Sequence, residues 1–157
     1  MREEPYLQTS ILDRLIDQEP ELPAEPVQRR LATLDSISQA VLRDLENLFN
    51  TRGGAPALPE SRHQVQGSIF SYGTRDFSSE NTRSNAVRLQ IRSEIERLLL
   101  LFEPRLRNVA VRLDTGPETG RTLHFRIEAL LQVEPQPAPL TFDTCLDINS
   151  GLYSILK

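Results

Sequence analysis

Glu134 and Asp143 are the two residues of this sequence whose types and spacing could support catalysis. Hydrolysis of a glycosidic bond uses two carboxyl groups on opposite sides of the sugar, and one of them needs a raised pKa. The chain holds 22 acidic residues among 157, however, so some pair at any chosen spacing is expected by chance. The stretch that follows Glu134, Pro-Gln-Pro-Ala-Pro, is not typical of a substrate-binding strand. We therefore expect no catalytic residues and no enzyme, and we keep a small cell-wall glycoside hydrolase as the alternative.

Histidine, cysteine and glycine residues form no metal or cofactor motif. His63 and His124 lie sixty-one positions apart, and neither has a histidine or cysteine at the spacing of metal ligands. Cys145 has an aspartate two positions away on either side, and their charge raises the pKa of a thiol rather than lowering it. Residues 116–122 are a poor phosphate-binding loop, because arginine replaces the lysine and two predicted strands flank the loop. We expect neither a metal nor a cofactor.

The charge distribution favours protein partners over nucleic acid. Residues 1–26 carry seven acidic residues against two arginines, whereas the remainder is almost neutral. Arginines between residues 83 and 97 alternate with Glu94 and Glu96, as on a solvated helix face, whereas nucleic-acid binding needs an unbalanced basic patch. The longest apolar run, residues 98–102, is far shorter than the roughly 20 residues of a membrane span. We expect no nucleic-acid ligand and no membrane-spanning segment.

The acidic segment of residues 1–26 contains a predicted short helix. Ser10 and Asp13 have the spacing of an N-terminal capping box, and three prolines in residues 19–26 form a linker to a single domain of residues 27–157. A helix this short is marginal alone in water, so it either folds back onto its own domain or docks on a partner, and the linker favours a partner. The apolar face consists of Leu7, Ile11, Leu12, Leu15 and Ile16.

Two longer helices and then several strands are predicted in the domain. The first helix covers residues 27–50, with Asp35 as a second N-cap and Gly53-Gly54 as its stop. The second begins near Asn81-Thr82 and ends at Glu103, because Pro104 excludes the residue before it from helical geometry. This order predicts an α+β fold, with the N-terminal helices packed on one face of a three- to four-stranded antiparallel sheet. The strands are residues 108–113, 123–133, 140–148 and 152–156, and the first two form a hairpin.

Four segments in series resemble the TssE family, the small baseplate subunits of bacterial type VI secretion systems. That family belongs with the wedge proteins of contractile phage-tail baseplates. The segments are residues 10–17 (SILDRLID), 41–52 (VLRDLENLFNTR), 72–77 (YGTRDF) and 102–106 (FEPRL), and Phe-Asp-Thr at 142–144 and Asn-Ser-Gly at 149–151 follow them.

The resemblance implies a structural role without catalysis. Such a subunit links the wedge core, formed by the proteins TssF and TssG, to the first ring of the contractile sheath and helps sheath assembly to start. Glu103, Pro104 and Arg105 are implied to face this core. The alternative is a buried Glu103–Arg105 pair that only fixes the corner between helix and strand.

The resemblance also implies that the sheet accepts strands from the sheath proteins TssB and TssC. An unpaired sheet edge binds such strands. The first candidate for this edge is the third strand, with Leu140 and Phe142, and the second candidate is residues 152–156. TssK is a further implied partner. The implied location is the cytoplasm, at the baseplate docked on the inner membrane, so that contact with the membrane is indirect.

Overall fold

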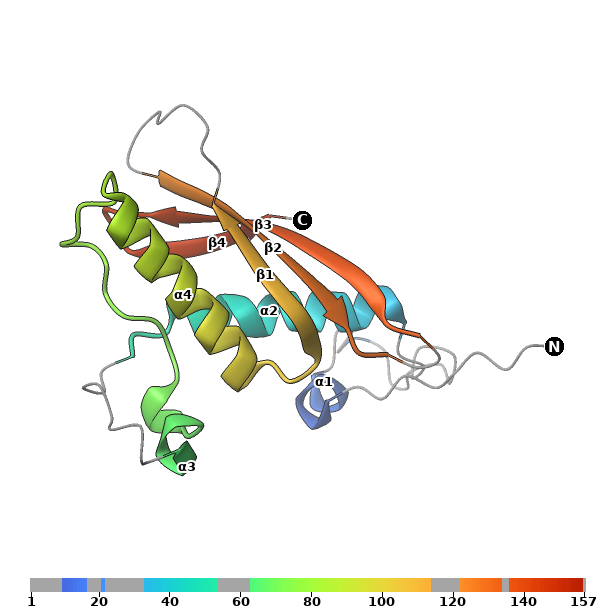
Figure 1. Ribbon diagram of the computed structural model, residues 1–157. Helices are drawn as coiled ribbons and strands as arrows, with labels where there is room; N and C mark the ends of the chain where they lie inside the picture. The colour runs from blue at the N-terminus through green and yellow to red at the C-terminus, as the bar shows by residue number, and fades with distance from the viewer. Residues whose placement is uncertain are drawn as a thin grey trace.

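The computed structural model describes residues 10–16, 21, 33–53, 63–113, 122–133 and 136–156. Within them, two long helices pack against one face of a four-stranded antiparallel sheet, which confirms the predicted α+β class (Figure 1). Leu7, Glu134, most of the linker and the turn of residues 114–121 lie outside the described residues. In chain order the elements are α1 (Ile11–Leu15), α2 (Leu34–Asn50), α3 (His63–Gln66), the 3-10 helix η2 (Ile69–Ser71), α4 (Asn85–Phe102), β1 (Leu106–Leu113), β2 (Thr122–Leu131), β3 (Ala138–Asp147) and β4 (Leu152–Leu156).

Helix α2 begins at a different cap from the predicted one. Thr33, and not Asp35, is its N-cap. The Ser36 N–H donates to Thr33 Oγ1 at 3.1 Å, and the Thr33 N–H donates to Ser36 Oγ at 2.9 Å. These two hydroxyls satisfy main-chain donors that the first helical turn leaves unpaired, so Asp35 lies inside the helix as a first-turn acid. The predicted helical residues 27–32 lie outside the described part of the chain.

Two other predicted helix boundaries are also displaced. The C-cap of α2 is Thr51, which has an extended backbone conformation, so the helix ends before Gly53. Gly53 instead allows its backbone to pass close to that of Gly73, because a Cβ there would lie 2.9 Å from the Gly73 carbonyl oxygen. Helix α4 starts after Ser84, since Asn81 Oδ1 accepts the Arg83 N–H in a separate turn before the helix.

The strands lie in the order β1-β2-β3-β4, and each pairs antiparallel with the next. Strands β2 and β3 pair along their whole length, from Thr122 opposite Asp147 to Leu131 opposite Ala138. Strand β1 has a register irregularity at Asn108, whose φ is 51°. Buried and exposed residues alternate along β2, so the sheet has one apolar and one polar face.

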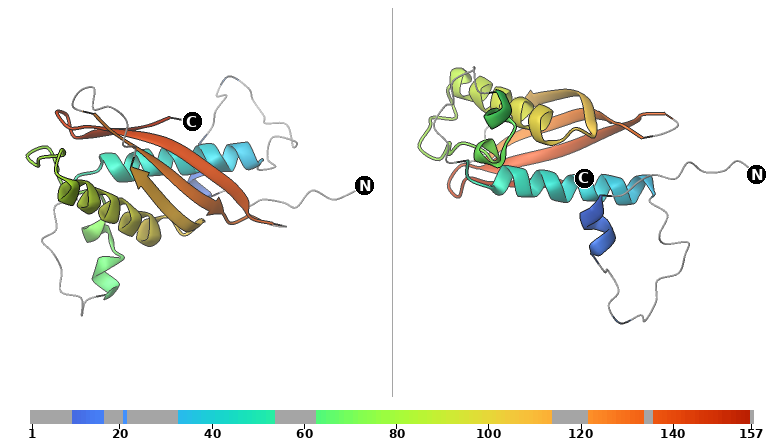
Figure 2. Two further views of the ribbon diagram at one scale, coloured as in Figure 1. Left: turned by 45° about the horizontal axis from the view of Figure 1, so that its top comes forward. Right: turned by 90° about the horizontal axis from the view of Figure 1, so that it is seen from below.

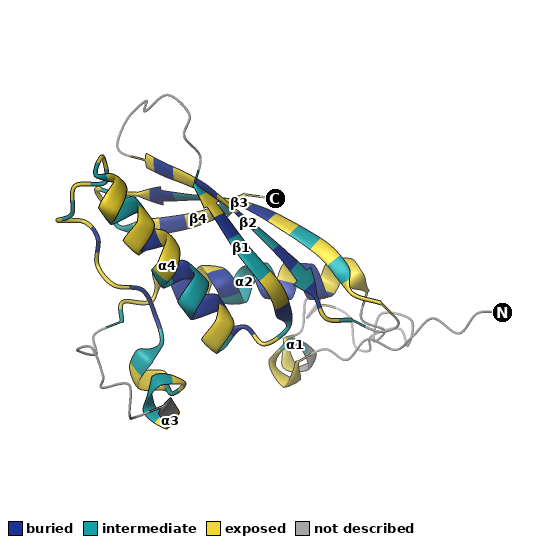
Figure 3. Ribbon diagram, in the orientation of Figure 1, coloured by how far each residue is buried: buried dark blue, intermediate teal, exposed yellow. Residues whose placement is uncertain are grey.

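Both long helices cover the apolar face of the sheet and form one core with it (Figure 2). Buried residues lie where the helices meet the sheet, and along the strands buried residues alternate with more exposed ones (Figure 3). Burial of each large apolar side chain in this core stabilises the folded state by about 1.5–3 kcal/mol. Those with the lowest exposure include Val41, Leu45 and Phe49 of α2, Ile91, Ile95, Leu98 and Leu99 of α4, and Val111, Phe125, Ile127, Leu131 and Phe142 of the strands.

The prediction that the third strand forms the sheet edge is wrong for half of that strand. Strand β3 lies between β2 and β4 over residues 143–147, because a turn with Gly151 at a φ of 65° folds β4 back onto it. Phe142 is 2% exposed and belongs to the core, while Leu140 is half-buried. Strand β4, the second candidate, forms this edge, and residues 138–142 of β3 extend beyond its pairing.

Candidate partner-binding site

The Glu-Pro-Arg sequence forms a tight corner between α4 and β1. Glu103 is the C-cap of α4, and its N–H donates to the Leu99 carbonyl at 3.0 Å. Pro104 lies exposed at the corner, and the Leu106 N–H donates back to the Glu103 carbonyl at 3.1 Å as β1 begins. The corner therefore reverses from helix to strand within three residues.

The carboxylate of Glu103 is buried, with 4% of its side chain exposed, and Arg105 neutralises it. Arg105 Nε donates to Glu103 Oε1 and Arg105 Nη2 donates to Glu103 Oε2, both at 2.6 Å. This two-bond pairing is the strong geometry of arginine with a carboxylate. The hydrogen bonds to Glu103 raise the pKa of Arg105, so its guanidinium stays charged. The corner has the geometry of the structural alternative, in which the pair fixes the turn from helix to strand.

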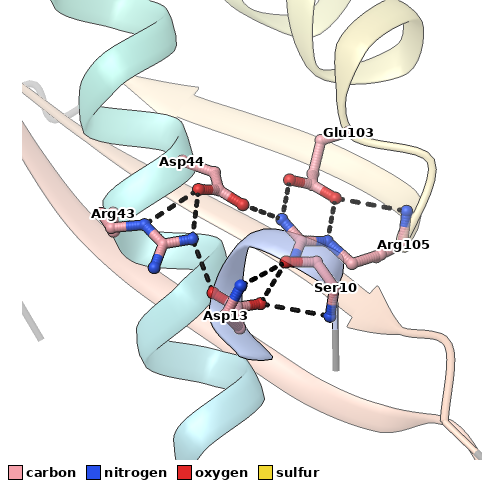
Figure 4. Close-up of polar contacts among 6 residues, drawn as sticks. All are labelled: Ser10, Asp13, Arg43, Asp44, Glu103 and Arg105. Carbon is pink, nitrogen blue, oxygen red and sulfur yellow. Dashed lines mark hydrogen bonds and ion pairs between the residues drawn. The ribbon is translucent and has the colours of Figure 1, made fainter. Parts of the chain in front are cut away.

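A chain of alternating charges extends from this corner to the N-terminal helix (Figure 4). Arg105 Nη2 also donates to Asp44 Oδ2 at 2.6 Å, and Arg43 Nη2 donates to Asp44 Oδ1 at 2.8 Å. Arg43 Nη2 lies 2.7 Å from Asp13 Oδ1. We call the five side chains Asp13, Arg43, Asp44, Glu103 and Arg105 the charge network. It connects α1, α2 and the corner, and it contains one more acid than bases.

Asp13 has two roles in α1. Its N–H donates to Ser10 Oγ at 3.1 Å and its Oδ2 accepts the Ser10 N–H at 3.3 Å, which confirms the predicted capping box. Burial acts to raise the pKa of Asp13, but hydrogen bonds from Ser10 and Arg43 outweigh it and lower that pKa below its usual value. The polar side of α1 is thus held against α2 by an ionised carboxylate.

The apolar side of α1 is turned away from the domain. Helix α1 is five residues long and ends at Leu15, because Ile16 already has an extended C-cap conformation. Its four apolar side chains are between 40% and 77% exposed, so contact with its own domain does not bury them. These side chains are Ile11, Leu12, Leu15 and Ile16.

The sequence pattern did not identify the roles of Arg43 and Asp44. Asp44 and Arg105 are 61 positions apart, and no local periodicity relates an acid in one helix to a base after another. Both residues do lie in the segment of residues 41–52 that carried the family resemblance. That resemblance was the available signal, although it assigned them no role.

The residues considered for hydrolysis and metal binding do not form a site in the described part of the chain. Asp143 is exposed and accepts a hydrogen bond from Arg126 Nε at 2.6 Å, which lowers its pKa, whereas a general acid needs a raised one. Cys145 Sγ lies 2.9 Å from Ser154 Oγ on the polar sheet face. Among the described residues, no group of three histidine, cysteine or acidic side chains could hold a metal ion. No described helix is long and apolar enough to cross a membrane.

Comparison with known proteins gives one family. The sequence profile described as baseplate wedge protein gp25 matches residues 35–136, which is more than half of the chain. The match begins in α2 and ends just before β3, so it includes Arg43, Asp44 and the Glu103–Arg105 corner. The search of curated proteins found no match. The chain therefore belongs to the baseplate wedge protein gp25 family, the family of the TssE subunits of type VI secretion systems, and has a structural role in a baseplate.

Proposed function

We propose that this chain is the wedge subunit that links the TssF–TssG core of a type VI secretion baseplate to the first ring of the contractile sheath. The observation that carries the proposal is the charge network, which joins the family-matched corner at Glu103–Arg105 to the N-terminal helix. In this proposal the protein acts in the cytoplasm, at the baseplate on the inner membrane, and TssK is a further contact.

The surface around the corner suits the TssF–TssG core. Arg43, Asp44 and Arg105 keep about a third of each side chain exposed, so a partner can meet both signs of charge there. Complementary charges fix the orientation of partners more than they add affinity. The exposed apolar side of α1 lies next to these charges and supplies the hydrophobic contact that stable interfaces need at their centre.

The edge of the sheet suits the sheath proteins TssB and TssC. Strand β4 pairs with β3 on one side and is the last strand of the sheet. An extended segment that adds to such an edge binds through main-chain hydrogen bonds, while its side chains select the partner. The helical end and the sheet edge would then contact different partners at the same time.

Binding to the purified TssF–TssG complex tests this function. The wild-type chain should be retained on immobilised TssF–TssG, and the double variant Ile11→Gln/Leu15→Gln should be retained at least tenfold less. Leu100→Gln is a matched control, because Leu100 is 68% exposed on a different helix. Failure of the wild-type chain to bind, together with clearing of a peptidoglycan suspension, would favour the hydrolase alternative instead.

A further inference from the structure

The side chain of Asn50 pairs with strand β4 as a neighbouring strand would. Asn50 is the last residue of α2, and its Nδ2 donates to the Tyr153 carbonyl oxygen at 2.9 Å. Its Oδ1 accepts the Tyr153 N–H at 2.8 Å. One carboxamide thus provides the donor and the acceptor that a residue of an adjacent antiparallel strand exchanges with its partner.

These two bonds identify the outward-facing positions of β4. Because Tyr153 directs both main-chain groups to Asn50, they point away from β3, although Tyr153 lies opposite Leu146 in the register. Along an antiparallel strand, successive residues direct their main-chain N–H and C=O groups alternately to one side and to the other. The main-chain groups of Leu152 and Ser154 therefore face β3, and those of Ile155 face outward again. Asn50 therefore pairs with one of the two β4 residues, Tyr153 and Ile155, whose main-chain groups face outward.

The other edge of the sheet is less suited to accept a strand. On β1, the Val111 N–H donates to Glu96 Oε1 of α4 at 3.3 Å. The register irregularity at Asn108 also interrupts the regular spacing of main-chain groups along β1. Bulges of this kind protect an edge strand from pairing. By contrast, the β4 edge has a regular register over all five residues.

We propose that Asn50 is a removable plug of the β4 edge. In the free subunit its carboxamide satisfies the main-chain groups of Tyr153, and an incoming extended segment displaces it and pairs with Tyr153 and Ile155. This inference rests on the proposed function, since the incoming segment is a strand of the sheath proteins. Leu152 and Leu156, each 55% exposed, flank Ser154 on the polar sheet face, so the segment carries apolar side chains at alternate positions.

The test compares the wild-type chain with Asn50→Ala, with Asn47→Ala as the matched control. Asn47 lies one turn earlier on α2, is exposed, and contributes its main-chain carbonyl to the Thr51 N–H. In the free Asn50→Ala variant, hydrogen exchange of the Tyr153 amide should be at least tenfold faster. The purified TssB–TssC complex should bind this variant about tenfold more tightly than the wild type, because no bonds to Asn50 must be broken first. Asn47→Ala should change neither quantity.

The outcomes separate the plug from the proposed function. Equal or weaker binding of TssB–TssC to Asn50→Ala, with normal binding to the wild type, overturns the plug and leaves the proposed function intact. Absence of binding to the wild type and to both variants overturns the sheath contact, and the plug with it. If Asn50→Ala does not fold, Asn50→Asp replaces it: the carboxylate keeps the bond from the Tyr153 N–H but repels its carbonyl, and tighter binding is again expected.

Discussion

Arg105 donates hydrogen bonds of 2.6 Å to both carboxylate oxygens of the buried Glu103, and its Nη2 atom, which makes one of these bonds, also donates to Asp44. The pair therefore does two things: it neutralises a buried charge at the end of α4, and it attaches the corner to α2. A change at Arg105 is therefore expected to act on the fold, and any effect on the proposed partner must be measured separately.

Arg105→Ala should destabilise the isolated subunit. The substitution leaves Glu103 buried without its counterion, and we expect the free energy of unfolding to fall by about 2–4 kcal/mol, somewhat less than for a fully buried pair. Urea denaturation followed by circular dichroism measures this loss. Adding Glu103→Gln to the variant should restore part of the stability, because a neutral amide costs less to leave unpaired.

Arg107→Ala is the control for this prediction. Arg107 is an exposed arginine two positions further on, and surface substitutions of this kind usually stay within about 0.5 kcal/mol. An Arg105→Ala protein as stable as the Arg107→Ala protein, yet unable to bind TssF–TssG, would show that the pair serves the interface and not the corner.

Deleting residues 1–26 should weaken wedge assembly and leave thermal stability nearly unchanged. The described contact of α1 with the domain is the ion pair between Asp13 and Arg43, and a pair with this exposure contributes about 0–1 kcal/mol. The apolar side chains of α1 remain exposed and add little to the stability of the domain. Differential scanning fluorimetry and retention on TssF–TssG measure the two effects. A large fall in melting temperature would mean that the segment packs on its own domain.

Acid should release α1 before the domain unfolds. The pKa of Asp13 is lowered from 3.8 in the folded state, so its stabilising effect is complete above pH 3.8 and is lost as the pH falls through the lower folded value. The NMR resonances of residues 10–16 should therefore shift in the window below pH 3.8. In Asp13→Asn, which has no carboxyl group to titrate, the same shift should be absent; its persistence would assign the acid response to another residue.

Ile155→Pro should leave the subunit folded and bound to TssF–TssG but unable to recruit TssB–TssC. Proline removes the outward N–H of the edge strand without removing a bond to β3. Ser154→Pro is the contrasting variant, since the Ser154 N–H faces β3 and its loss should lower the melting temperature. Asp143 and Cys145 also pair with β4, so prolines there would test the fold and not the edge. Sheath recruitment by Ile155→Pro would exclude strand addition at β4.

Local signals were sufficient to predict most of the elements. The Ser10–Asp13 capping box, the alternation along β2 and the end of α4 before Pro104 each depend on residues a few positions apart. The α2 start was displaced because Thr33 competes with Asp35 for the cap, and both are good N-cap residues.

Contacts between distant residues could not be predicted in the same way. Asp44 meets Arg105 across 61 positions and Asn50 meets Tyr153 across 103, and neither pair leaves a periodic trace in the sequence. The strand at residues 152–156 was predicted, but its pairing with β3, which moves the sheet edge, depends on the Gly151 turn and on tertiary contacts with α2.

In the proposed function, this chain is a physical link between the wedge core and the sheath. The most direct measurement is the retention of purified TssB–TssC on immobilised TssF–TssG, with and without the chain. We predict retention only when the chain is present, and its loss with either Ile155→Pro or deletion of residues 1–26. Retention of TssB–TssC that is the same without the chain, or absent when the wild-type chain is bound, would contradict this linking function.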